Sequence, residues 1–129
     1  MLPHLSNEHS HRIEAPARFF AELGNLHDAK ILRLEWNPAE RKVVLTLDDL
    51  YSNFVGLPEH TGRQPVCLVM SGVSRLEIDA TPDKFPLRIV DFEIDEATAG
   101  TEMHVVVNLG PSGLMRATFD SIAGHAAGL

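Results

Sequence analysis

Residues 30–47 of the chain read KILRLEWNPAERKVVLTL, and this stretch decides the fold. Apolar side chains occupy every second position on both sides of a short segment, 37–40, that contains a proline. Alternation of this kind is typical of a half-buried strand, and two such runs joined by a proline turn predict a β-hairpin. The alternating residues that we expect to face one core are Leu32, Leu34, Trp36, Val43, Leu45 and Leu47.

The same alternation recurs along the rest of the chain. It is found at 66–79, with an interruption at Gly72, and again at 87–94, 102–109 and 114–119. Short turns separate these runs, and no strand–helix–strand alternation is present. Gly72 indicates either a bulge in one strand or a bend between two. The sequence therefore predicts an α+β fold that is mostly β. It consists of an antiparallel meander of six to seven strands, in a curved sheet or a two-layer sandwich.

One short helix is expected at residues 15–23, before the hairpin. Pro16 suits the first turn of a helix, and Gly24 suits its end. Phe19 and Phe20 would dock on the sheet, because a helix of this length is marginal by itself. We expect residues 1–14 to form a flexible arm, residues 15–120 a single domain, and residues 121–129 a tail of small residues.

Composition narrows the classes of function. The chain has 129 residues, 44% of them hydrophobic, and a formal net charge of −7. An acidic surface repels phosphate backbones, and no basic stripe is present, so we expect no nucleic-acid partner. The single cysteine, Cys67, the short apolar runs and the absence of a signal peptide at the start predict a soluble protein of a bacterial-type cytoplasm without membrane contact.

The chain contains the segment Leu26-His27-Asp28-Ala29, followed by a Leu-x-Leu-x-Trp strand and a hairpin that ends in Leu-Asp-Asp. It resembles small uncharacterised bacterial domains that begin with a helix, a His-Asp pair and a β-meander. Some of those domains are similar to immunity proteins encoded beside polymorphic toxins. The resemblance covers the first half of the chain. It implies a fold more than a function, and it carries over no catalytic residue.

Four polar residues are candidates for a site: His27, Asp28, Asp48 and Asp49. A histidine beside a carboxylate could act as a general base, and adjacent carboxylates could hold a cation through waters. However, neighbouring side chains on an extended strand point apart, so Asp28 is poorly placed to orient His27. The competing interpretation is structural, with these side chains bonding backbone N–H groups near turns.

Other combinations of residues are weaker candidates for a functional site. Cys67 with His104 could pair as nucleophile and base, but Cys67 lies in an apolar run typical of a buried thiol. His4, His9 and His11 lie in the expected arm and lack the further ligands that a closed zinc site needs. The common nucleotide-binding and hydrolase motifs are absent from the sequence. We therefore predict no catalytic residue, no metal site and no cofactor.

The densest charge lies at 91–96. Asp91, Glu93 and Asp95 alternate, so they would project from one face of a strand while Val90, Phe92 and Ile94 face inward. They could dock a basic protein partner, or they could protect an edge strand from pairing with another molecule. Together these features favour a non-catalytic protein-binding or regulatory module, and an immunity-type protein is one form of such a module. The alternatives are a small enzyme or metal-dependent protein that uses the four polar residues, and a homo-oligomer whose sheet edges pair.

Overall fold

A computed structural model describes residues 3, 5, 10–60, 62–96 and 102–127. Its helical segments are α1 (Pro16–Glu22) and the 3-10 turns η1 (Gly24–Leu26), η2 (Ser52–Phe54) and η3 (Pro82–Lys84). Its strands are β1 (His11–Arg12), β2 (Lys30–Asn37), β3 (Lys42–Leu47), β4 (Val66–Ser71), β5 (Arg75–Asp79), β6 (Leu87–Glu96), β7 (Met103–Gly110), β8 (Leu114–Phe119) and β9 (Ser121–Ala126). The described residues thus form nine strands rather than the six to seven expected.

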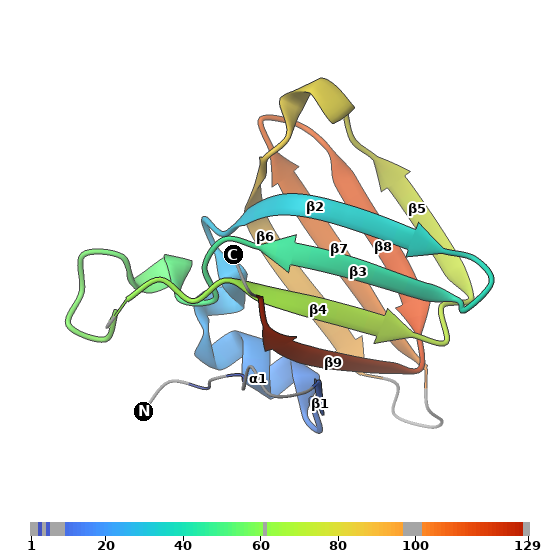
Figure 1. Ribbon diagram of the computed structural model, residues 1–129, viewed down its shortest axis with the longest axis horizontal. Coiled ribbons are helices and arrows are strands. Elements are labelled where there is room, and N and C mark those ends of the chain that lie inside the picture. Colours follow the sequence, from blue (N-terminus) through green and yellow to red (C-terminus); the bar gives the residue numbers. More distant parts are fainter. Residues whose placement is uncertain (1–2, 4, 6–9, 61, 97–101, 128–129) are drawn as a thin grey trace.

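The strands form two layers that share one continuous antiparallel sheet. Their order is β1-β9-β4-β3-β2-β6-β7-β8-β5. Figure 1 shows β2, β3, β4 and β9 running across the front, with β5, β6, β7 and β8 crossing behind them at a steep angle. The layers join where Lys30 and Ile31 of β2 pair with Arg88 and Leu87 of β6. The mostly-β antiparallel class and the single α-helix are as predicted.

The hairpin forms as expected, with one shift. Strands β2 and β3 pair from Trp36 with Val43 to Ile31 with Leu47, but the register slips between Ile31 and Arg33. An extra residue at a bulge reverses the faces of the residues beyond it. Leu32 is therefore 37% exposed and Ile31 is fully buried. The prediction that Leu32 faces the core was wrong, because alternation read from sequence does not reveal a bulge.

The segments on either side of Gly72 are two strands that belong to different layers. Strand β4 pairs with β3 and β9, whereas β5 pairs with β8 at the far edge of the other layer. Gly72 adopts φ +69° where the chain leaves β4. Of the two alternatives, the bend between two strands is therefore correct, and the bulge is not. The pattern did not predict that the second strand joins the other layer.

The expected arm and tail both contain strands. Residues 121–126 of the tail form β9, which pairs with β4 along its whole length and with the short β1. Leu5 and Ile13 are only 7% and 6% exposed, so parts of the N-terminal segment pack against the core. The tail was predicted from its small residues, but small residues also allow close packing. Leu5 lies against Gly124, where a side chain in place of the glycine would collide with it.

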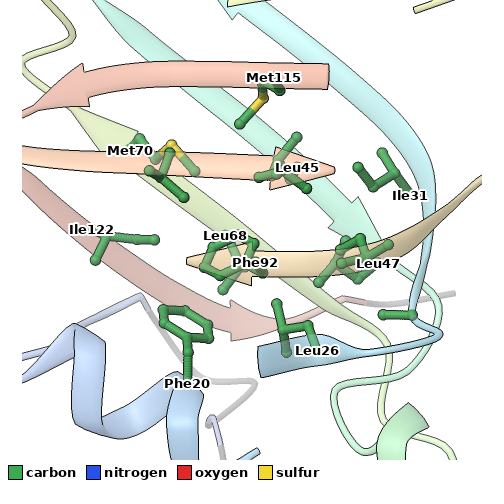
Figure 2. Close-up of a cluster of buried hydrophobic side chains, with 14 of the residues drawn as sticks. Phe20, Leu26, Ile31, Leu45, Leu47, Leu68, Met70, Phe92, Met115 and Ile122 are labelled. Carbon is green, nitrogen blue, oxygen red and sulfur yellow. The ribbon is translucent and has the colours of Figure 1, made fainter. Parts of the chain in front are cut away.

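The core lies between the two layers and is closed at one end by α1. Figure 2 shows side chains of both layers meeting there, among them Leu45, Leu68 and Phe92. Phe20 of α1 packs its ring 4.7 Å from the ring of Phe92, which docks the helix as predicted. Glu96 Oε1 accepts a hydrogen bond of 3.1 Å from the backbone N–H of Ala17 and so ties the helix start to β6. No helix in the described part of the chain is long and apolar enough to cross a membrane.

Candidate functional site

The acidic residues of β6 lie on the outer face of the layer formed by β6, β7, β8 and β5. Phe92 is fully buried on the inner face, and the carboxylates that alternate with it point outward. In register they stand opposite residues of β7: Asp91 opposite Asn108, Glu93 opposite Val106, and Asp95 opposite His104. We call Asp91, Glu93 and Asp95 the acidic row.

One residue of this strand departs from the predicted alternation. Val90, expected to face inward, is 39% exposed. The register of β6 against β7 slips between Ile89 and Asp91, and the bulge turns Val90 outward. The residues of the acidic row follow the bulge, so they keep a common face.

The acidic row is electrostatically unbalanced. In the part of the chain that the structure describes, none of its three carboxylates forms an ion pair with a cationic side chain. A hydrogen bond between the carboxyl groups of Asp91 and Glu93, together with their mutual repulsion, raises the pKa of Glu93 above its ordinary 4.5. Asp91 and Glu93 thus interact with each other and not with a cationic side chain of the described residues.

A hollow of about 380 Å³ lies beside the acidic row on the same face. His104 Nδ1 and Thr118 Oγ1 are 2.9 Å apart at its floor, and Thr118 is only 8% exposed. Arg75 and Arg116 rise from β5 and β8, and Glu77 and Glu102 also line the hollow. Two arginines and two glutamates balance one another, so the hollow carries no net charge apart from the adjacent acidic row.

In the described structure, strand β6 has partners on both sides only in its first part, residues 87–90. On one side it pairs with β7 along its length. On the other side, Asp28 N donates to the Ile89 carbonyl, and the ring of His27 bonds the Val90 carbonyl. These contacts end before the acidic row, and no described strand pairs with residues 91–96 on that side, so edge protection stays open as the competing interpretation of the row.

The His27–Asp28 pair is engaged within the fold. His27 Nδ1 lies 2.9 Å from the Val90 carbonyl oxygen, which can only accept, so this nitrogen donates. Asp28 adopts φ +70°, which turns its carboxylate back toward its neighbour, 3.6 Å from His27 Nε2. This corrects the expectation that the two side chains point apart. Asp28 also bonds Arg88 at 3.0 Å. The fold thus engages His27 through Nδ1, whereas Nε2 lies near the Asp28 carboxylate without a hydrogen bond on a half-exposed ring.

Asp48 and Asp49 organise the loop that follows the hairpin. Asp48 Oδ1 accepts from the backbone N–H of Lys30 at 2.8 Å. The side chain of Asp49 is only 5% exposed and accepts from the backbone N–H groups of Tyr51 and Gln64 and from His60 Nε2, the last at 2.7 Å. Burial and the nearby carboxylate of Asp49 raise the pKa of Tyr51 above 10.0. Asp48 and Asp49 thus bond groups of the chain itself. His60 was not predicted from the sequence, because it lies eleven positions after Asp49 in a loop without periodicity.

The remaining candidate residues do not come together in one site. Cys67 lies in β4 and His104 in the other layer. Cys67 instead stands opposite Thr46, with Sγ 3.6 Å from Thr46 Oγ1, and opposite His125, whose buried Nδ1 has no hydrogen-bond partner among the described residues. His4 and His9 lie outside the described residues, and His11 belongs to β1. Within the described ranges, no three histidine, cysteine or acidic side chains gather as metal ligands.

Comparison with known proteins gives a structural likeness. No protein family matches the chain, and no curated protein does. A crystal structure of an uncharacterized protein from Neisseria gonorrhoeae is similar, with a TM-score of 0.54 over 91% of this chain and 97% of that one. The two sequences are 9% identical. At that identity the likeness shows a shared fold and carries no functional assignment.

Proposed function

We propose that the chain is a non-catalytic protein-binding module that holds a basic segment of a partner protein against the acidic row of β6. The observation that carries this proposal is the contrast among its carboxylates. Asp28, Asp48 and Asp49 are bonded by groups of the chain itself, whereas the acidic row has no cationic partner in the described structure. Like charges on one strand face repel one another, and a basic partner relieves that repulsion.

The geometry of the row suits an extended basic segment. Alternate residues of a strand lie roughly 7 Å apart, so the Cα atoms of the three acidic residues span about 13 Å in a line. An extended partner segment presents alternate side chains at the same interval. Lysines or arginines at every second position would therefore meet all three carboxylates together. The net charge of −7 adds long-range attraction that speeds encounter.

The enzymatic alternative has less support. It requires His27, Asp28, Asp48 and Asp49 to present free groups to one substrate. Asp49 is buried under three hydrogen bonds, Asp28 is paired with Arg88, and His27 is tied to the Val90 carbonyl through Nδ1. The resemblance to immunity-type domains agrees with a binding role, and a toxin gene beside this one would support that form of it.

A peptide with Lys at alternate positions (Lys-Thr-Lys-Thr-Lys, fluorescently labelled) tests the proposal by anisotropy. We expect saturable binding that weakens with salt, and about tenfold weaker binding to the variant Asp91→Lys with Glu93→Lys, mainly through a slower on-rate. The matched control is Glu59→Lys with Asp83→Lys, which changes net charge equally at exposed sites elsewhere. A second peptide of the same composition, Lys-Lys-Lys-Thr-Thr, tests the spacing.

Loss of binding by the acidic-row variant alone, with preference for the alternating peptide, supports the proposal. Equal binding by the acidic-row variant and the control variant would contradict it, because attraction would then come from net charge alone. The variant Asp91→Lys with Glu93→Lys must also keep the unfolding midpoint of the wild type, so that lost binding reflects the changed face and not a loss of folding.

A further inference from the structure

Strand β5 is one of the two terminal strands of the sheet in the described structure, and its five residues are long enough to pair with another molecule. It is last in the strand order and pairs only with β8, so its other side carries unpaired backbone groups. The opposite edge of the sheet is β1, which has two residues. A free strand edge is a template for pairing, and proteins commonly leave it short, charged or covered.

An apolar cleft runs along this free edge. It has a volume of about 470 Å³ and lies between β5 and the tip of the β2–β3 hairpin. Trp36 and Ile78 line it, and each is 42% exposed, together with Leu76 and Val73. Trp36 pairs in register with the buried Val43, so its ring belongs to the core side of the sheet. It stays exposed because no strand covers it.

The sequence of β5 is complementary to itself. It reads Arg75, Leu76, Glu77, Ile78, Asp79. In an antiparallel pair of two such strands centred on Glu77, Arg75 stands opposite Asp79 of the partner subunit and Leu76 opposite the partner's Ile78. Each of these contacts occurs twice by symmetry. Neither Arg75 nor Asp79 forms an ion pair within the described residues of one chain, so both charges are open to a second copy.

We infer that two copies of this chain associate through β5, in the register centred on Glu77, to form a dimer with one continuous sheet. Two opposite-charge pairs and two apolar pairs favour it, and one like-charge contact, between Glu77 and its symmetry mate, opposes it. A shift of one residue would place the charged face of one strand against the apolar face of the other. This inference is independent of the acidic row, because β7 and β8 lie between β6 and β5 in the sheet.

A second register with matched faces is centred on Leu76. It would place Arg75 opposite the partner's Glu77 but leave Ile78 and Asp79 beyond the end of the paired strand. The two registers predict opposite effects at Glu77. Replacing Glu77 removes a repulsion in the register that we infer and an attraction in the other. Only the register centred on Glu77 pairs all five residues of β5.

Sedimentation velocity of the full chain over a concentration series tests the inference. We expect a reversible monomer–dimer equilibrium from 14.2 kDa to twice that mass. Arg75→Asp and Asp79→Arg should each weaken the dimer on the order of tenfold, because each turns two attractions into repulsions. The double variant Arg75→Asp with Asp79→Arg should restore it. Glu77→Thr should tighten it, and Asp83→Arg, an exposed control outside β5, should change nothing.

Several results would overturn the inference. One is a single mass of 14.2 kDa at every concentration tested. A dimer that is indifferent to both charge reversals would place the interface elsewhere. Weakening by Glu77→Thr without an effect of Asp79→Arg would show the register centred on Leu76. All variants change exposed side chains, and a thermal unfolding curve for each separates lost association from lost folding.

Discussion

The loop residues Asp48 and Asp49 resemble the acidic row in sequence, because both are groups of closely spaced acidic residues. The surroundings of their carboxylates in the structure differ. Asp49 is buried, and its two oxygens accept from two backbone N–H groups and from His60. Glu93 is exposed, and its neighbour is another carboxyl group, that of Asp91. A carboxylate that is bonded by its own chain stabilises the fold. A carboxylate that meets only like charge adds repulsion to the fold and remains available to another molecule.

The largest effect that this comparison predicts is at Asp49. Asp49→Ala leaves the N–H groups of Tyr51 and Gln64 without their acceptor in a buried setting, and the unfolding free energy should fall by about 2–4 kcal/mol. Urea unfolding measures this loss. Asp95→Ala on the acidic row is the matched control and should change stability by less than about 0.5 kcal/mol. Equal losses of unfolding free energy at Asp49 and Asp95 would contradict the distinction between carboxylates bonded by the chain and those of the acidic row.

A smaller effect is expected at Asp48, which bonds a single backbone N–H at the start of β2. Asp48→Ala should cost about 1 kcal/mol, the net worth of one hydrogen bond that water can partly replace. Asp48→Asn retains an acceptor oxygen and should recover most of that loss. A cost at Asp48 as large as that at Asp49 would show that burial is not what separates them.

These two carboxylates also show what a sequence can reveal. The hairpin was predictable because alternation records which face is buried, and Val43, Leu45 and Leu47 are indeed fully buried. The structural interpretation of Asp48 and Asp49 was likewise available from their place at a strand end. The partner of Asp49 was not, because a loop fold brings His60 to it and leaves no period in the sequence.

The two bulges and the layer crossing were beyond local pattern for a related reason. Leu32 and Val90 follow the alternation of their strands and yet lie on the wrong side of a register shift. The hollow beside the acidic row depends on β5 pairing with β8, which brings Arg75 next to Thr118. That pairing joins residues from Asp79 with Leu114 to Arg75 with Thr118, which are far apart in the chain, and only the whole fold determines it.

A third prediction concerns Tyr51, the single tyrosine of the chain, whose pKa is raised by burial first and by Asp49 second. A phenol with a raised pKa in the folded state favours folding below its ordinary pKa of 10.0, and that contribution is lost as the pH rises through the folded value. Spectrophotometric titration should find the phenol titrating above 10.0. Asp49→Asn should lower the pKa only in part, because burial is the larger cause. A complete return to 10.0 would reverse that order.

The smallest effect is expected on the acidic row itself, at Glu93. Its raised pKa means that the folded state favours the protonated carboxyl, so the favourable contribution is present below the ordinary 4.5 and is lost as the pH rises through the folded value. At neutral pH the ionised pair of Asp91 and Glu93 opposes folding slightly. Glu93→Gln removes one of the two charges, and the melting temperature should therefore rise a little at neutral pH.

The gain from Glu93→Gln should disappear in acid, where the wild-type carboxyl is protonated, and should shrink in high salt, which screens exposed charges. Glu59→Gln, an exposed change elsewhere that removes one charge from the same net −7, separates local repulsion from the effect of total charge. If Glu93→Gln instead lowered the melting temperature at neutral pH, the acidic row would be stabilising the fold. Its carboxylates would then belong with Asp48 and Asp49, and the reason to assign them to a partner would be gone.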